Sequence, residues 1–433
     1  MKRIVLVVLF VAVALTSIGP IRNYDFFWHL ATGRWITEHR ALPRTDPFAI
    51  ASDRGPWING EWLFEVVLYA LRGVNVSLLR SLFIAALFAF LFYFSGNVLL
   101  TTLAFAGAMA TLDLRPASIA AFFVAIAIVI TRRNNVLLYI LFVVLWINVH
   151  PSALLAPAIA LSLTRKWPIT LAGAAALLVN PFGIQGVIAP LKLTLFASGG
   201  EFVNAEWLPS GPLIFPLLYV TIIVAAIGFA MKREDVGRVL LALLLAYLAI
   251  AHVRNQPLWF AAFPLLVEAE WKRFEYVLSA ALVIFVAIRT DHRIGFPPER
   301  FPIEAVAQLK GLKGNIYNPD QFGGYLIWSF YPERRALTDG RNELYHAFIP
   351  EYARARVDGR AWRALLRKYK IDLAVDEYRP PLEVLDAATG QHKKMPAWMV
   401  YWPPKEWALI AQDRAGMVFA RRAILSSPSR TEN

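Results

Sequence analysis

The sequence predicts a polytopic α-helical membrane protein with about 11 transmembrane helices and a small C-terminal α/β domain, and three observations support this fold class. Of its 433 residues, 58% are hydrophobic and 17% charged, and the mean hydropathy is +0.49. Soluble chains are ordinarily less apolar. Apolar runs of roughly 15 to 20 residues recur as far as Arg289, close to the ~20 residues that a helix needs to cross a bilayer. Beyond them, charged residues, Pro and Gly mix, as in a soluble domain.

The first apolar run, Ile4 to Ile18, follows Lys2 and Arg3. Basic residues stay in the cytoplasm, so we expect a cytoplasmic N-terminus. A cleaved signal peptide is the alternative, because it has the same basic and apolar regions, but the absence of an A-x-A site favours an uncleaved span. Residues 61–72 are short and contain three charged side chains. They predict a helix that lies on the outer membrane surface.

Ten further spans complete the membrane region. They are expected at 76–94, 97–111, 117–131, 136–149, 152–164, 168–180, 213–231, 238–252, 257–270 and 275–289. This assignment places four basic pairs in the cytoplasm, as the positive-inside rule requires: Arg132-Arg133, Arg165-Lys166, Lys232-Arg233 and Lys272-Arg273. An odd number of spans puts the C-terminal region outside. We therefore predict a transmembrane domain at 1–292, with a long first external loop at 19–75, and an extracytoplasmic domain at 293–433.

Charge and cysteine content exclude several functions. The formal net charge is +13, but basic cytoplasmic loops account for it better than nucleic acid does, so no nucleic-acid partner is predicted. The chain has no cysteine, which excludes disulfides, thiol catalysis and Cys-ligated zinc.

The predicted topology gathers most candidates for chemistry on the outer side. Charges at helix ends also snorkel to the interface or pair with one another, which is the structural alternative for each of them. The candidates include Asp25, His29, Arg34, Asp46, Glu61, Asp113, Arg115, His150, Glu206 and Arg254.

Asp25 stands at the predicted start of a short helix in the first external loop. One interpretation is an N-cap, a position at which Asp is preferred. The other is a carboxylate base at the bilayer surface. His29 follows by one helical turn and is expected on the same face, where three roles are open: orienting an acceptor, binding phosphate or ligating a metal.

The region after Phe296 predicts a small α/β domain. Helices are expected at 303–309 and 362–369. Strands are expected at NIYN, RALTD, IDLAVDEY, MVYW, WALIAQD and GMVFARR. FGGYLIWSF predicts a turn into a helix, and its glycines lack phosphate-loop spacing. Asp339 and Arg341 are candidates to bind an acceptor or to brace the domain, and bracing is favoured.

Several motifs together resemble a known family. In chain order they are YDFFWHLATGRWI, LPRTDPFA, WINGEWLFE, LRPASIAAFF, LWINVHPSALLAPAIAL, VNPFGIQGV, FGGYLIW and TDGRNELY. The chain is similar to bacterial multispan proteins classed with the type C glycosyltransferases, which include protein O-mannosyltransferases, aminoarabinose transferases and oligosaccharyltransferases. The resemblance implies an inverting enzyme of the bacterial cytoplasmic membrane. Its partners would be membrane lipid, a polyprenyl phosphate-linked sugar and an acceptor glycan, lipid or protein.

The same resemblance implies roles for individual residues. Asp25 matches the family's catalytic aspartate in the first external loop. Arg115, Arg254 and Arg34 supply guanidinium groups for the donor phosphate, and His150 either contacts substrate or caps a helix. No cofactor is assigned. Many relatives carry a second acidic residue beside the aspartate, whereas Asp25 is followed by two phenylalanines, so a divalent metal would have to be completed by distant carboxylates: Asp113, Glu61 or Glu206.

Two other functions are alternatives. A transporter or flippase of lipid-linked saccharide predicts polar residues at the bilayer midplane and an internal repeat, and neither is visible in the sequence. A non-catalytic polytopic scaffold would leave the external charged residues without a role.

Overall fold

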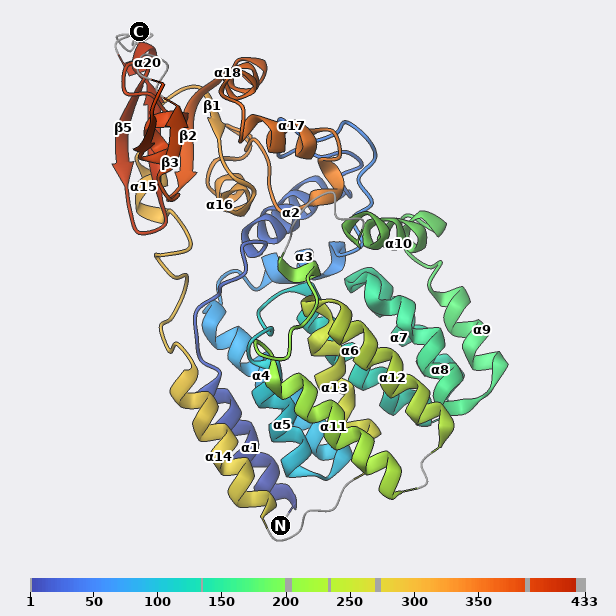
Figure 1. Ribbon diagram of the computed structural model, residues 1–433. Helices are drawn as coiled ribbons and strands as arrows, with labels where there is room; N and C mark the ends of the chain where they lie inside the picture. Colours follow the sequence, from blue (N-terminus) through green and yellow to red (C-terminus); the bar gives the residue numbers. More distant parts are fainter. Residues whose placement is uncertain are drawn as a thin grey trace. The chain divides into compact units, whose positions relative to one another are not determined.

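The computed structural model describes residues 2–133, 135–198, 205–232, 235–268, 274–385 and 390–425, and the chain forms two compact units (Figure 1). The first unit contains Met1–Asn23 and Ile58–Gly295. The second contains Tyr24–Trp57 and Phe296–Asn433. The C-terminal part of the second unit begins at Phe296, close to the domain boundary expected at 293. However, most of the expected first external loop belongs to this second unit and not to the helical one.

The first unit is built from helices, and each of the eleven expected spans coincides with helical structure. The long helices are α1 (Lys2–Thr16), α4 (Val76–Ser95), α5 (Val98–Ala108), α6 (Pro116–Arg132), α7 (Val136–Val149), α8 (Ala156–Thr164), α9 (Trp167–Ala176), α10 (Ile184–Ser198), α11 (Pro216–Met231), α12 (Val236–Ala251), α13 (Gln256–Leu266) and α14 (Glu275–Arg289). The short elements are α3 (Trp62–Ala70), η1 (Pro151–Leu155), η2 (Ala205–Trp207) and η3 (Val253–Asn255). Helix α3 matches the surface helix expected at 61–72.

Helix α13 forms the centre of the first unit. All eleven of its residues are buried, and it packs against α4, α5, α6, α11 and α12. A helix that is apolar all round belongs in a core. Two polar contacts fix its N-terminal half: Gln256 Nε2 donates to Ser210 Oγ at 2.8 Å, and Trp259 Nε1 donates to Thr221 Oγ1 at 2.8 Å. Buried polar groups are stable only with such partners.

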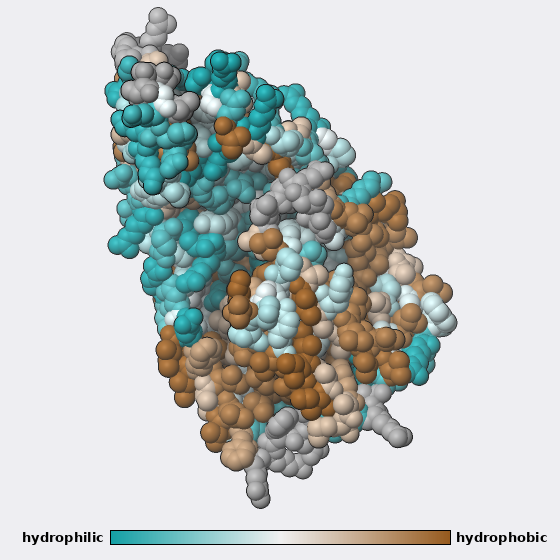
Figure 2. Space-filling view, in the orientation of Figure 1, coloured by the Kyte–Doolittle hydropathy of each residue, from teal (hydrophilic) through white to brown (hydrophobic). Residues whose placement is uncertain are grey.

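The surface of the first unit is strongly hydrophobic (Figure 2). Exposed apolar side chains recur on helices α1, α7, α12 and α14, and examples at 61–78% exposure are Ile4, Leu137, Leu243 and Ile288. Contiguous apolar surface of this kind marks contact with a membrane or a partner. Among the described residues, one helix, α4, is long and apolar enough to cross a bilayer by itself, and seven other apolar helices have 10–17 residues.

The second unit contains a four-stranded sheet in the order β1-β2-β6-β5. Its strands are β1 (Asn315–Tyr317), β2 (Ile371–Glu377), β5 (Trp407–Gln412) and β6 (Gly416–Arg421), and β3 (Leu382–Leu385) pairs separately with β4 (His392–Met395). Only β1 and β2 are parallel. The helices are α2 (Phe26–His39), α15 (Ile303–Ala307), α16 (Asp320–Phe330), α17 (Phe348–Ala355), α18 (Gly359–Lys368), α19 (Ala397–Tyr401) and α20 (Arg422–Leu425), with η4 at Asn342–Leu344. The expected α/β character is confirmed.

Backbone hydrogen bonds join residues 24–57 to the C-terminal part of the second unit. Ala49 forms an isolated parallel bridge with Ala336, and the amide of Ile50 donates to the Ala336 carbonyl at 2.9 Å. Further along, the amide of Asp53 donates to the Leu344 carbonyl at 2.7 Å. These bonds satisfy backbone groups that burial would otherwise leave unpaired. The segment 24–57 is therefore an integral part of the second unit.

Two expected strands are wrong. Met399, Val400 and Tyr401 of MVYW lie in α19, which begins after Pro396, and Trp402 directly follows the helix. Short apolar runs do not distinguish a strand from a buried helix, and proline favours the first turn of a helix. In the RALTD segment, only Ala336 pairs as a strand residue would, in its bridge to Ala49. The residues beside it make side-chain and turn contacts and do not form a ladder.

Candidate functional site

Asp25 lies immediately before α2 in the second unit, and its side chain makes no capping hydrogen bond. Its Oδ1 accepts a hydrogen bond from Trp28 Nε1 at 3.0 Å. The donor lies three residues further along the chain, in α2, and the bond fixes the position of one carboxylate oxygen. The position is that of an N-cap, but the carboxylate does not perform the capping role.

Three glycines allow backbone to approach the Asp25 segment closely. A Cβ on Gly340 would lie 2.6 Å from Asp25 Oδ1. On α16, a Cβ on Gly324 would lie 2.9 Å from the Tyr24 carbonyl, and one on Gly323 would lie 1.9 Å from the Thr338 carbonyl. At Gly323 and Gly324 the opposing atoms are backbone, so glycine is required there, whereas at Gly340 the Asp25 carboxylate would have to move. The paired glycines of FGGYLIW thus serve close packing of α16, on one side against the start of α2 and on the other against Thr338.

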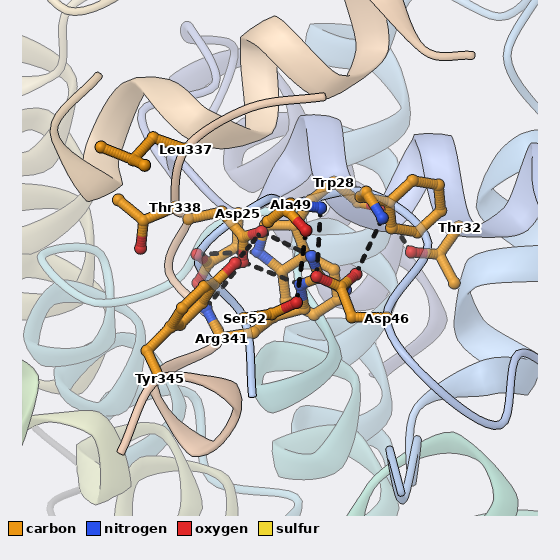
Figure 3. Close-up of polar contacts among 12 residues, drawn as sticks. Asp25, Trp28, Thr32, Asp46, Ala49, Ser52, Leu337, Thr338, Arg341 and Tyr345 are labelled. Carbon is orange, nitrogen blue, oxygen red and sulfur yellow. Dashed lines mark hydrogen bonds and ion pairs between the residues drawn. The ribbon is translucent and has the colours of Figure 1, made fainter. Parts of the chain in front are cut away.

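Arg341 lies at the centre of a closed ion network beside Asp25 (Figure 3). The guanidinium is 1% exposed. Its Nε and Nη2 donate to the two carboxylate oxygens of Asp339 at 2.8 and 2.5 Å, and its Nη1 lies 3.0 Å from Asp46 Oδ1. Tyr345 donates its hydroxyl to Asp339 Oδ2 at 2.6 Å. Two carboxylates therefore neutralise one buried guanidinium, as a bracing role requires.

The aromatic rings of the first loop enclose the same guanidinium. Arg341 Cζ lies 4.6 Å from the ring centroid of Trp57, 5.3 Å from that of Phe48 and 5.6 Å from that of Trp28. Cation–π contacts of a desolvated guanidinium add to its stability. Burial by itself raises the pKa of Asp339, but the Arg341 ion pair and the Tyr345 hydroxyl hold that pKa below its ordinary value.

Glu343 contributes a second carboxyl group close to Asp25. It lies in η4, three residues after Gly340. Burial raises its pKa to about 7; Arg341 lowers it, while Asp339 and Asp25 raise it further. Among the described residues its carboxyl group makes no ion pair, and its hydrogen bond is with the Glu343 backbone itself. Glu343 therefore differs from Asp339 and Asp46, each of which has an oxygen in contact with Arg341.

The two basic candidates on α2, Arg34 and His29, lie in packed surroundings and not at an open site. Arg34 Nη2 donates to the Tyr331 carbonyl at 2.6 Å, and its guanidinium lies 5.1 Å from the Trp328 ring centroid. These contacts brace α2 against α16. His29 is 2% exposed, and its ring lies 3.6 Å from that of Trp28. Burial of this kind is typical of a packing position.

In the first unit, two predicted arginines meet one carboxylate. Arg115 directly precedes α6, and Arg254 lies in η3 before α13. Helices α6 and α13 pack together. Arg115 Nη1 forms an ion pair with Glu206 Oε1, and the Arg254 guanidinium stacks on the Trp207 ring at 4.5 Å. We call Arg115, Glu206, Trp207 and Arg254 the arginine cluster.

The arginine cluster carries an excess positive charge. Burial by itself raises the pKa of Glu206, but Arg115 and Arg254 together hold that pKa below its ordinary value. Glu206 is therefore a carboxylate at neutral pH, and one negative charge faces two guanidiniums. Within the described part of the chain, Arg254 makes no hydrogen bond or ion pair, so its donors remain available to an anion. Guanidinium groups bind phosphate through two parallel hydrogen bonds.

His150 lies next to the arginine cluster and is neutral. Its pKa is lowered to about 3 by burial first, then by Arg254 and Arg115. The Nδ1 atom accepts from the Ser152 amide at 3.0 Å and caps η1. Because Nδ1 is an acceptor, the proton is on Nε2, which lies 3.5 Å from Glu61 Oε1. Nδ1 therefore performs the capping role that was one alternative for His150, while Nε2 faces Glu61.

The carboxylate of Asp113 is committed to backbone. Its Oδ2 accepts from the amides of Arg22 and Asn23 at 2.8 and 2.9 Å, and its Oδ1 accepts from its neighbour Leu114 at 2.7 Å. Arg80 Nε lies 3.4 Å away. Across the described ranges, no group of three or more His, Asp or Glu side chains could hold a metal ion. The surroundings of Asp113 do not fit a metal site.

The structure thus brings five predicted residues together in the first unit, namely Glu61, Arg115, His150, Glu206 and Arg254, and places Asp25, Asp339 and Arg341 together in the second. Sequence reasoning named Asp46 among the external polar residues but gave it no partner, and it missed Glu343 and Gly340. The motif TDGRNELY contains two of these three, so a search for a titratable residue within that motif would have found Glu343. Nothing local in the sequence marks Asp46 as a partner of Arg341.

Comparison with known proteins identifies a solved structure with a similar fold. No protein-family model matches the chain, and no curated protein matches it by sequence. Among solved structures it is similar to the archaeal oligosaccharyltransferase AglB from Archaeoglobus fulgidus, in complex with an inhibitory peptide and a dolichol-phosphate. The TM-score is 0.53 and the identity 9%, over 91% of this chain and 74% of that chain. The expected likeness to type C glycosyltransferases is therefore supported at the level of the fold.

Proposed function

We propose that this protein is a membrane glycosyltransferase that transfers a saccharide from a polyprenyl phosphate-linked donor to an extracytoplasmic acceptor. The observation that carries the proposal is the fold likeness over 91% of the chain to an oligosaccharyltransferase whose structure contains a dolichol-phosphate. Dolichol-phosphate is a polyprenyl-type lipid phosphate. The protein would act at the outer face of a bacterial cytoplasmic membrane, with eleven spans and a cytoplasmic N-terminus.

Asp25 is the proposed general base. In a single displacement, an acceptor oxygen attacks the anomeric carbon, the bond from that carbon to the phosphate oxygen breaks, and the phosphate leaves with the electron pair. The acceptor proton passes to the Asp25 carboxylate, and the anomeric configuration inverts. The hydrogen bond from Trp28 holds Oδ1 in place, and a positioned base contributes roughly 10²–10⁴ to the rate.

The arginine cluster is the proposed contact for the donor phosphate. Charge grows on the phosphate as the glycosidic bond breaks, so guanidinium donors stabilise the transition state more than the ground state. Arg254 has uncommitted donors among the described residues, and Arg115 shares its charge with Glu206.

The test is transfer of label from a panel of radiolabelled polyprenyl phosphate sugars, with membranes that contain wild-type protein or Asp25→Asn. We expect Asp25→Asn to lower the transfer rate by about 10²–10⁴ at unchanged expression. Asp372→Asn is the matched control, because this carboxylate lies on the surface of the same unit near Arg421. Equal transfer by wild type and Asp25→Asn would exclude Asp25 as the base, whereas no transfer by wild type from any donor of the panel would favour a transporter or a scaffold.

A further inference from the structure

Two chain segments of the first unit run side by side to the points where that unit ends. Helices α1 and α14 pack against each other (Figure 1). Each is followed by a short segment, residues 17–23 after α1 and residues 290–295 after α14, and we call these the exit segments. The amide of Ile21 donates to the Gly295 carbonyl at 2.9 Å. The exit segments are therefore joined to each other through backbone within the first unit.

Charged side chains hold the exit segments in place. Arg22 Nη2 donates to Asp291 Oδ2 at 2.9 Å, and Arg293 Nη2 donates to the same oxygen at 2.8 Å. Arg80, on α4, donates from Nη1 to the Ser17 carbonyl at 2.7 Å. Hydrogen bonds from Arg293 and from Arg22 hold the pKa of Asp291 well below its ordinary value. This carboxylate therefore keeps its charge in the neutral pH range.

His292 bridges the two exit segments through both nitrogens of its ring. Its Nδ1 lies 3.1 Å from the Ile18 carbonyl oxygen, and its Nε2 lies 2.9 Å from the carbonyl oxygen of Ala287, in the last turn of α14. A carbonyl oxygen can only accept, and a neutral imidazole donates from only one nitrogen. Both contacts are hydrogen bonds only when the ring carries two protons. A cation at the C-terminus of a helix is also stabilised by the helix dipole.

His292 is the group in this region whose charge depends on pH in the neutral range. Histidine ordinarily changes its charge between about pH 5 and 8. Four guanidiniums and two carboxylates surround the exit segments in the described part of the first unit, so protonation of the ring depends on its two carbonyl partners and on the helix terminus. These groups are Arg22, Asp291 and Arg293 on the exit segments, Arg289 at the end of α14, Arg80 on α4 and Asp113 before α6.

We propose that His292 is a pH-sensitive clamp, in which the imidazolium joins the exit segments by donating to the carbonyls of Ile18 and Ala287. Loss of one proton leaves a ring nitrogen and a carbonyl oxygen facing each other with no hydrogen between them, so one of the two contacts is released. The clamp is complete at acidic pH and is lost as the pH rises through the titration of the ring. Asp25 follows the first exit segment by two residues, so the clamp orders the backbone that leads to it.

The experiment measures hydrogen–deuterium exchange of the full-length protein in nanodiscs between about pH 5 and 8. The readout is the protection of peptides that contain the exit segments, after division by the intrinsic exchange rate at each pH. We expect this protection to fall about two- to fivefold from the acidic to the basic end of the range, as the loss of a charge at a helix C-terminus implies. In His292→Gln, whose amide does not titrate, the fall should disappear.

His392→Gln is the matched control, because His392 is an exposed histidine on β4 in the second unit. We expect this variant to keep the wild-type pH dependence at the exit segments. His292 is also exposed, so neither substitution disturbs a core. Equal pH dependence in wild type and His292→Gln, or protection of the wild-type exit segments that does not change with pH, would overturn the clamp.

Discussion

The two units treat buried arginine in opposite ways. In the second unit, Arg341 is fully buried between Asp339 and Asp46, so the charges in that network are matched or exceeded by carboxylates. In the first unit, Arg115 and Arg254 share the single carboxylate of Glu206. A buried guanidinium with matched partners stabilises one conformation, whereas guanidiniums in excess retain donors for a ligand. Both units contain arginine beside carboxylates. Only the number of nearby carboxylates distinguishes the arginine that braces the second unit from the arginines that form a candidate binding site in the first unit.

The largest expected effect tests the brace. Arg341→Met removes the cation and leaves Asp339 and Asp46 buried without it, so we expect a loss of about 3–5 kcal/mol in unfolding free energy. Thermal or denaturant unfolding of the full-length protein measures the loss. Arg363→Met is the control, because Arg363 is exposed on α18. A change below that of the control would show that the network contributes nothing to stability.

The next effect concerns the backbone that faces Asp25. Gly340→Ala puts a Cβ within 2.6 Å of Asp25 Oδ1, so the carboxylate must move. A displacement of about 1 Å costs on the order of 10² in rate. We expect that loss in the transfer assay, with little change for Gly359→Ala, whose new Cβ would meet only Arg363 at 3.8 Å. Full activity of Gly340→Ala would mean that the position of Asp25 is not critical.

A somewhat smaller effect is expected at the arginine cluster. Arg254→Gln removes charge-assisted hydrogen bonds to phosphate worth about 1.5–3 kcal/mol, which corresponds to roughly 10- to 100-fold weaker binding of polyprenyl phosphate. Binding by wild type should also fall as salt increases, and that dependence should weaken in the variant. Arg289→Gln, at the exposed end of α14, is the control. Identical salt dependence in wild type and Arg254→Gln would contradict the assignment.

The smallest expected effect concerns the pKa of Glu343 in the second unit. Its pKa is raised from 4.5 to about 7 by burial, so the folded protein binds this proton more tightly than the unfolded chain does. The stabilisation is complete below pH 4.5 and is lost as the pH rises through about 7. Relative to Glu343→Gln, wild type should therefore lose unfolding free energy steadily over that interval. Parallel stability curves for the two proteins would show that Glu343 titrates normally.

Much of the helical architecture could be predicted from the sequence, because apolar runs and basic pairs reflect simple transfer energies. The helices at α4, α7 and α14 begin and end within two residues of the expected spans. Predictions failed where a short segment was apolar but ambiguous. MVYW has the composition of a strand, yet its residues pack as α19 and the turn after it, because tertiary contacts outweigh local propensity in a segment of that length.

The candidate residues were predictable by type but not by partner. The sequence predicted donor-phosphate contacts for Arg115 and Arg254 and favoured a bracing role for Arg341, but it named no partner for any of the three. Arg34 was expected to bind phosphate, but in the structure it donates to the Tyr331 carbonyl. A carbonyl 297 positions away in the sequence leaves no local signal at Arg34.

The sequence by itself determined that this chain has an apolar helical region, a mixed C-terminal region and an acidic residue at the start of the first external helix. Hydrophobicity and helix-end preferences are local properties, so they can be read along the chain. Only the tertiary structure decided that residues 24–57 belong with the C-terminal region, that Arg341 is neutralised and that Arg254 is not. Those outcomes depend on which distant carboxylates and carbonyls come within about 3–4 Å, and electrostatic energy at that range is set by position in space and not by order in the sequence.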